Sequence, residues 1–243
     1  MKALLSFFTV LPVRGASLEQ AAREVYLLPL VGIVTGLPGA VLLLSALFVP
    51  PGVASTLALG AVLVAAGLHH ADGVLDVGDA LMVQGTPERR RAVLEDTRVG
   101  VGGIGALFLV YGPTVAALAA LCAASPCRAA LALLAGEVAA RSAMVLTLAY
   151  GKPAEAGSSS VPFVRALSES RHTTGVALAL LAPLPFLFPL GPLTPLAVLA
   201  APLVALVSIR IAQAAFDGIV GDVVGATGEA CRAVVLVAIS AMM

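Results

Sequence analysis

The sequence predicts an all-α protein, a polytopic bundle of about six or seven transmembrane helices with its active site on the cytoplasmic side. Three observations lead to this fold class. Of the 243 residues, 60% are hydrophobic and 12% are charged, whereas about 25% of a soluble domain is charged. Long stretches carry no charge, and the charges gather between them. This composition excludes a disordered chain and a coiled coil, and a net charge of zero leaves no basic face for nucleic acid.

The uncharged stretches define the predicted spans, because about 20 apolar residues cross a hydrocarbon core of roughly 30 Å. Uncharged runs cover residues 25–49, 52–68, 99–127 and 173–209. The last run has 37 residues and several prolines, so we divide it into two helices. Residues 129–149 add a span that contains only Glu137 and Arg141 as charges, and the tail from about residue 226 to 243 adds a seventh. We expect residues 1–243 to form a single integral membrane domain.

The segments between the spans differ in charge. Twelve of the fourteen Lys and Arg residues, and thirteen of the fourteen acids, lie in residues 1–24, 72–98, 151–172 and 210–232. The alternate turns hold one cation, Arg128. Because cationic loops stay in the cytoplasm, we expect a multi-pass protein of the cell membrane with its charged loops in the cytoplasm. Polar groups on one face favour an enzyme over a transporter, which needs polar groups near the midplane.

The strongest motif contains three aspartates, Asp72, Asp76 and Asp79, after His69 and His70. A helix turns about 100° per residue, so the three carboxylates share one face. Clustered like charges are unfavourable unless a cation neutralises them. Mg²⁺ suits such a face, since it binds one or two carboxylates together with substrate phosphates. Three solvated acids at a helix end, with histidines that only pack, remain the alternative.

Three further features are candidates for chemistry. Asp96 and Arg98 lie where a span begins, so they could face the metal site. Asp222 lies among four glycines between residues 218 and 228, which fits either a close approach to phosphate or a simple helix junction. Glu137 and Arg141 are four residues apart inside a span. They form a self-neutralising pair, or Arg141 reaches a substrate phosphate.

Six motifs follow one another along the chain: residues 7–13 (FFTVLPV), 28–32 (LPLVG), 70–79 (HADGVLDVGD), 96–100 (DTRVG), 140–144 (ARSAM) and 221–226 (GDVVGA). In this order, over nearly the whole length, they resemble the cobalamin synthase family, the adenosylcobinamide-GDP ribazoletransferases. The resemblance implies a Mg²⁺-dependent membrane enzyme. A hydroxyl of α-ribazole, or of its 5′-phosphate, attacks the pyrophosphate of adenosylcobinamide-GDP, GMP leaves, and the nucleotide loop of adenosylcobalamin is closed.

This resemblance gives the candidate residues their expected roles. Asp72, Asp76 and Asp79 hold Mg²⁺. The expected catalytic residues are Asp96, Asp222, Arg98 and Arg141, and the expected substrate-binding residues are His70, Lys152, Glu155 and Gly221. The expected partners are the two small-molecule substrates and membrane lipid, not nucleic acid, and the formation of a homo-oligomer is left open.

Two other functions remain as alternatives. A CDP-alcohol phosphotransferase also places aspartates of a membrane helix on Mg²⁺, but its pattern has Ala-Arg after the first Asp-Gly, whereas Val74 and Leu75 follow Gly73 here. A cobalt or corrinoid transporter would move its substrate without releasing GMP. An assay of GMP release distinguishes all three.

Overall fold

The computed structural model describes residues 1–13, 17–154 and 158–243, without the side chains of residues 169 and 170. The described residues form helices and turns and one isolated bridge, between Pro153 and Ile219, so the predicted all-α class is confirmed. The helices are α1 (Lys2–Phe8), α2 (Leu18–Glu24), α3 (Leu28–Leu43), α4 (Pro51–Ala65), α5 (His69–Met82), α6 (Pro87–Leu94), α7 (Val101–Ala124), α8 (Pro126–Tyr150), α9 (Val161–Ala166), α10 (His172–Leu181), α11 (Leu184–Leu187), α12 (Ala200–Phe216) and α13 (Gly221–Met242). Short 3-10 or π-helical turns are η1 (Val25–Leu27), η2 (Leu44–Leu47), η3 (Leu167–Arg171), η4 (Phe188–Leu190) and η5 (Thr194–Leu199).

Six helical stretches of the described chain are long and apolar enough to cross a membrane, and a seventh is added if α4 and α5 are counted as one bent span. The six stretches are Leu18–Leu47, Val101–Ala124, Pro126–Tyr150, His172–Leu190, Thr194–Phe216 and Gly221–Met242. The predicted number is therefore confirmed, and the long uncharged run is divided as predicted. The last helix begins at Gly221, five residues before the predicted start, because its glycines pack against neighbouring helices instead of ending it.

The span predicted over residues 52–68 ends earlier than expected. Helix α4 stops at Ala65, and α5 leaves it at an angle of 96°. The chain turns through Gly67 and Leu68, whose φ angles are 78° and 63°. Positive φ suits glycine and costs a residue such as leucine roughly 1–2 kcal/mol. Since α5 has 14 residues, or about 21 Å, it is too short to cross alone, and we treat it as lying outside the spanning segments.

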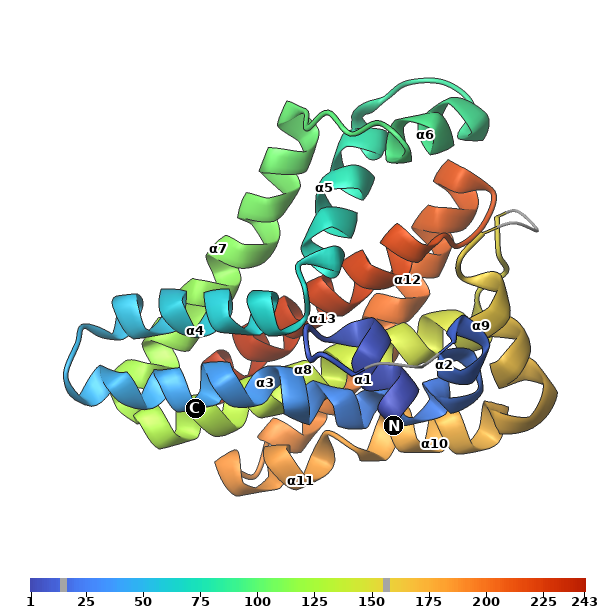
Figure 1. The fold of residues 1–243 in the computed structure, drawn as a ribbon. Helices are drawn as coiled ribbons and strands as arrows, with labels where there is room; N and C mark the ends of the chain where they lie inside the picture. Colours follow the sequence, from blue (N-terminus) through green and yellow to red (C-terminus); the bar gives the residue numbers. More distant parts are fainter. Residues whose placement is uncertain (14–16, 155–157) are drawn as a thin grey trace.

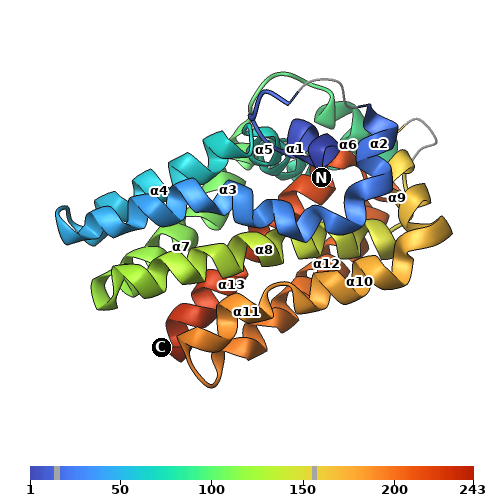
Figure 2. The ribbon, with the colours of Figure 1, turned by 60° about the horizontal axis from the view of Figure 1, so that its bottom comes forward.

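Helix α8 forms the centre of the bundle. In the most apolar window of α8, 83% of the residues are buried. The share is 28% in the corresponding windows of α7, α10–η4 and η5–α12. In two views, α3 and α4 lie on one side of α8, and α10 and α11 on the other (Figures 1 and 2). A Cβ atom on Gly32 of α3 would lie 2.5 Å from the carbonyl oxygen of Glu137 on α8. The backbones of α3 and α8 are therefore in direct contact.

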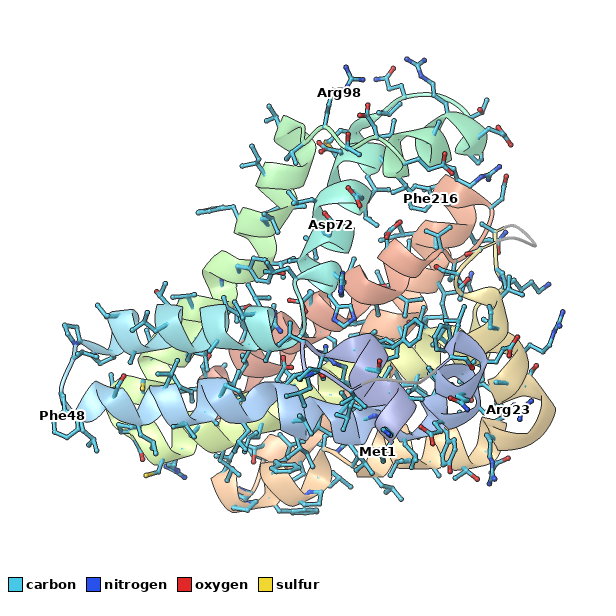
Figure 3. The ribbon with its side chains drawn as sticks, viewed as in Figure 1. Met1, Arg23, Phe48, Asp72, Arg98 and Phe216 are labelled. Carbon is cyan, nitrogen blue, oxygen red and sulfur yellow. The ribbon has the colours of Figure 1, made fainter. Side chains whose placement is uncertain are left out.

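The two ends of the bundle carry different connections. Phe48, from a short uncharged turn, lies at one end, and Arg23 and Phe216, from two charged segments, lie at the opposite end (Figure 3). The alternation predicted from the charges is thus present in the fold. The amino group of Met1 pairs with Glu24, which ties α1 to α2 at the charged end.

Candidate active site

The three aspartates of the strongest motif all lie on α5, as predicted (Figure 3 labels Asp72). Asp72 is exposed, and Asp76 and Asp79 are partly exposed. Helix α5 packs against both α7 and α13. The acidic face of α5 therefore lies near two further helices, and these helices give the three aspartates different surroundings.

Two glycines bring α13 onto α5. A Cβ atom on Gly73 would lie 2.7 Å from the carbonyl oxygen of Asp222, and one on Gly225 would lie 3.2 Å from Cα of His70. Gly73 leaves no room for a side chain, and the contact at Gly225 is tight. The close contact places Asp222, a candidate from the glycine-rich motif, beside the α5 aspartates.

The charges of these carboxylates act on one another. Burial, together with the charges of Asp72, Asp222 and Asp79, raises the pKa of Asp76 to about 6. Like charges held close together favour the protonated form of one of them. We call Asp72, Asp76 and Asp222 the acidic cluster. Such a cluster is relieved by a proton or by a cation.

Asp79 makes a contact that the sequence did not reveal. Its carboxylate accepts hydrogen bonds from the backbone N–H of Gly100 at 2.6 Å and of Gly103 at 2.8 Å. Gly100 is the N-cap of α7 and has no side chain to satisfy the first N–H groups of that helix. Asp79 therefore caps α7 from another helix, and both of its oxygens are engaged.

The acidic cluster fits a Mg²⁺ ion that shares its coordination with a substrate. Within the described residues, no three His, Cys, Asp or Glu side chains lie close enough together to hold a metal ion by themselves. Mg²⁺ does not need such a cage, since it keeps several waters and binds one or two carboxylates plus substrate phosphates. The raised pKa of Asp76 marks a place where positive charge is favourable.

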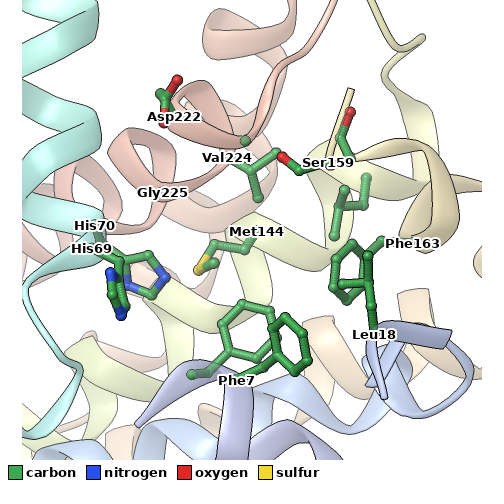
Figure 4. A pocket seen from close by; sticks show the side chains of 14 residues that line it. Phe7, Leu18, His69, His70, Met144, Ser159, Phe163, Asp222, Val224 and Gly225 are labelled. Carbon is green, nitrogen blue, oxygen red and sulfur yellow. The ribbon is translucent and has the colours of Figure 1, made fainter. Parts of the chain in front are cut away.

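Two cavities meet at Asp222. The first has a volume of about 360 Å³ and is lined by Phe7, Phe8, Leu18, His69, His70, Met144, Leu148, Ser159, Ser160, Phe163, Gly221, Asp222, Val224 and Gly225 (Figure 4). The second has a volume of about 280 Å³ and is lined by Arg91, Leu94, Glu95, Ser158, Ser159, Val220, Gly221 and Asp222. They share Ser159, Gly221 and Asp222. A largely apolar cavity thus adjoins a polar one at an acid of the cluster.

The family model described as cobalamin-5-phosphate synthase matches residues 1–240 of the chain. The chain belongs to this family. The resemblance seen in the six sequence motifs is therefore confirmed.

Relatives agree with the family model over nearly their whole lengths. The chain is 38% identical to an adenosylcobinamide-GDP ribazoletransferase of Pyrobaculum calidifontis, covering 98% of this chain and 97% of the relative. Enzymes of the same name from Pyrobaculum islandicum (36% identical, 97% and 92% covered) and Azorhizobium caulinodans (32%, 95% and 90%) are also similar. No solved structure matches this fold.

Two of the predicted catalytic residues, Asp96 and Arg98, lie apart from the two cavities. Asp96 and Arg98 are in the connection between α6 and α7, where Figure 3 shows Arg98 at the outer edge. The Arg98 guanidinium donates to both carboxylate oxygens of Asp96, at 2.7 Å for Nη2 to Oδ2. This contact lowers the pKa of Asp96 to about 2. The two residues neutralise each other, and neither lines the two cavities that meet at Asp222.

Arg141 belongs to a set of charges inside the bundle, which we call the buried network: Glu137, Arg141, Glu229 and Arg232. All four side chains are fully buried. Arg141 lies 3.4 Å from Glu137, and Arg232 donates to Glu137 at 2.7 Å and pairs with Glu229. The Arg141 guanidinium is thus enclosed among helices and is not open to a substrate phosphate.

Glu229 and Arg232 were not predicted as an intramembrane pair. They were counted with the charged segment 210–232, although they also fall in the span predicted from about residue 226, and α13 begins at Gly221. The two residues are three apart on a helix, as Glu137 and Arg141 are four apart. That spacing, together with the apolar residues between and after them, was the signal for a second intramembrane pair.

The predicted substrate-binding residues are only partly brought together. His70 and Gly221 line the first cavity. Burial, with the charges of Arg141 and Arg232, lowers the pKa of His70 well below its usual range. Lys152 is exposed. Its backbone oxygen accepts a hydrogen bond from the N–H of Ile219 at 2.7 Å, and Ile219 is close in sequence to Gly221. Glu155 lies outside the described residues.

Proposed function

We propose that this protein is an adenosylcobinamide-GDP ribazoletransferase. A ribose hydroxyl of α-ribazole, or of its 5′-phosphate, attacks the corrinoid-linked phosphorus of adenosylcobinamide-GDP. A new O–P bond forms, the pyrophosphate bond breaks, and GMP leaves with the bridging oxygen. Membership of the family and the names of the relatives support this activity. In the structure, the observation that supports it best is that Asp222, which lines both cavities, lies beside the aspartates of α5.

The acidic cluster is our candidate for the Mg²⁺ site. Asp72 and Asp76 from α5 would hold the ion, with Asp222 of α13 beside them, and the ion would neutralise charge on the pyrophosphate. Asp79 was predicted as a third ligand. Its hydrogen bonds to α7 favour a role in holding α5 and α7 together.

A carboxylate must also accept the proton of the attacking hydroxyl. Asp222 is better placed than Asp96, because it lines both cavities. The low pKa of Asp96, about 2, makes it a weak base at neutral pH. We therefore propose Asp222 for this step.

The predicted roles of the two arginines receive less support. Arg98 would need to leave Asp96 to bind a phosphate, and Arg141 is enclosed in the buried network. Arg91 lines the polar cavity beside Asp222 and carries the guanidinium that phosphate recognition favours. It also donates to the backbone oxygen of Phe216 and pairs with Glu88 and Asp217. We propose that the charged end of the bundle, with both cavities, faces the cytoplasm, as the cationic segments indicate.

The proposal is tested with purified protein in detergent. The protein is supplied with adenosylcobinamide-GDP, α-ribazole and Mg²⁺, and the release of GMP is measured together with the corrinoid product. We expect both products in equal amounts. The Asp72→Asn and Asp76→Asn variants should lose most of this activity, whereas Glu88→Gln, a matched change at an exposed acid of α6, should keep it.

Other outcomes would contradict the proposal. Uptake of a corrinoid into proteoliposomes without GMP release would indicate a transporter. Release of CMP from a CDP-alcohol would indicate the other phosphotransferase class. Wild-type rates in Asp72→Asn and Asp76→Asn would remove the acidic cluster from the reaction.

A further inference from the structure

The 360 Å³ cavity has two chemically different sides. Phe7 lies at one side, and Asp222 and Ser159 lie at the opposite side, with Met144 and Phe163 between them (Figure 4). The wall is contributed by α1, α2, α5, α8, α9 and α13. A site of this kind takes a ligand with an apolar body and a polar end.

The apolar side is built from aromatic rings. The Phe8 ring meets Phe163 edge-on, with centroids 6.0 Å apart at 65°, and its centroid lies 6.2 Å from that of His70. Rings arranged in this way present both edges and faces to a further aromatic group, and such pairs are favourable beyond the area that they bury. The cavity is thus suited to a planar aromatic ligand.

Met144 is held at the wall of this cavity by α13. A Cβ atom on Gly228 would lie 3.0 Å from the Met144 sulfur, so the thioether rests directly on the α13 backbone. Methionine sulfur makes favourable contacts with aromatic rings and adapts to their outline. Met144 therefore adds an apolar contact for a ring that enters between α1 and α13.

The volume of the cavity indicates which of the two substrates of the proposed reaction fits inside it. Small-molecule sites are commonly about 300–1,000 Å³, and this one, at about 360 Å³, is near the lower limit. It suits a nucleoside and is too small for a corrin macrocycle with its side chains. The corrin macrocycle of the donor therefore stays outside this cavity, and only its pyrophosphate needs to reach Asp222, which also borders the adjoining polar cavity.

We propose that this cavity binds the aromatic base of the acceptor nucleoside and selects apolar bicyclic bases. The base lies among Phe8, Met144 and Phe163, and the ribose extends toward Ser159 and Asp222, where its hydroxyl meets the pyrophosphate. This assignment rests on the proposed function for the identity of the nucleoside. Phe8, Met144 and Phe163 offer no hydrogen-bond partner to the polar edge groups of a base such as adenine, so those groups would be unpaired where they face these three side chains, which is unfavourable.

The test compares substitutions in the aromatic wall with a matched substitution elsewhere. Phe163→Ala and Phe163→Leu change the cavity, whereas Phe188→Ala removes an exposed ring in η4. We expect Phe163→Ala to raise the KM for α-ribazole about 10-fold, in line with the discrimination that apolar pockets provide. Phe163→Leu should raise it less, and the KM for adenosylcobinamide-GDP should stay within twofold in both variants. Phe188→Ala should leave both constants unchanged.

Nucleoside binding is also measured directly, so that the test depends neither on turnover nor on an alanine variant that fails to fold. Calorimetry with α-ribazole and with adenosine, without the corrinoid donor, should show tighter binding of α-ribazole by wild type and loss of that preference in Phe163→Leu. Equal binding of the two nucleosides by wild type, or an unchanged preference in Phe163→Leu, would overturn the assignment. So would a rise confined to the KM for the donor. If wild type released no GMP, the proposed function would fail, while the nucleoside preference would still decide what this cavity binds.

Discussion

Two groups of charged side chains meet on α13, and they differ in composition and exposure. The buried network combines two glutamates and two arginines, all fully buried and paired with one another. The acidic cluster contains carboxylates only, and each of its side chains is at least partly exposed. The first group is neutral within itself. The second keeps a repulsion that a cation would relieve. This difference distinguishes a structural element from the site that we propose for Mg²⁺.

The largest expected effect comes from breaking the buried network. Arg232→Met removes a guanidinium that two carboxylates share and leaves them buried with one cation less. Removing one partner of a buried pair costs about 3–5 kcal/mol. Unfolding in detergent by heat or denaturant should show this loss for Arg232→Met and little change for Arg210→Met, an exposed arginine of α12. Equal stability of the two variants would mean that the network contributes nothing.

Substitutions in the acidic cluster should have the opposite pattern. Asp72→Asn and Asp76→Asn remove a repelling charge, so the stability of the fold should be unchanged or increased. If these residues hold Mg²⁺ at the pyrophosphate, activity should fall about 100-fold or more, since metal stabilisation of the transition state supplies several kcal/mol. The measurement is GMP release beside the unfolding midpoint. A joint loss of stability and activity would place the cluster with the buried network.

Asp79 should behave differently from the other α5 aspartates. Asp79→Ala removes the acceptor for the first N–H groups of α7, and loss of a cap costs about 1 kcal/mol. Asp79→Asn, which keeps one acceptor oxygen, should cost less. Unfolding of both variants, with Glu88→Ala as a surface control, checks this order. A greater loss of activity than of stability would return Asp79 to the metal ligands.

The smallest expected effect is a pH dependence of stability. Because the pKa of Asp76 is raised from 3.8 to about 6 in the folded state, the folded state binds this proton more tightly than the unfolded state does. Stability should therefore decrease as the pH rises through that range. The decrease should be smaller in Asp76→Asn, and Mg²⁺ should offset it at pH 7 in wild type. Identical pH profiles for the two proteins would contradict this coupling.

Much of the fold follows from the sequence because the membrane imposes length and polarity on each span. The uncharged runs identified the spans, and the alternation of charges identified the two ends. The placement of Asp72, Asp76 and Asp79 on one helix followed from their spacing. The family was evident from the order of its motifs.

The remaining features depend on contacts between segments far apart in the chain. The bend after α4 uses a leucine with positive φ, which no propensity scale favours at that place. The cap that Asp79 provides joins residues 21 and 24 positions apart. The glycines before Glu229 and Arg232 fitted either a phosphate contact or a helix junction, and the structure shows that they let α13 touch neighbouring helices.

The most direct test is the dependence of GMP release on Mg²⁺ concentration in wild type and in Asp76→Asn. We expect wild-type release from adenosylcobinamide-GDP and α-ribazole to rise with Mg²⁺ to a plateau. We expect Asp76→Asn, although folded, to need far more Mg²⁺ or to stay near background. Release by wild type that does not depend on a divalent cation, or an unchanged Mg²⁺ dependence in Asp76→Asn, would mean that the acidic cluster does not hold a catalytic Mg²⁺ ion.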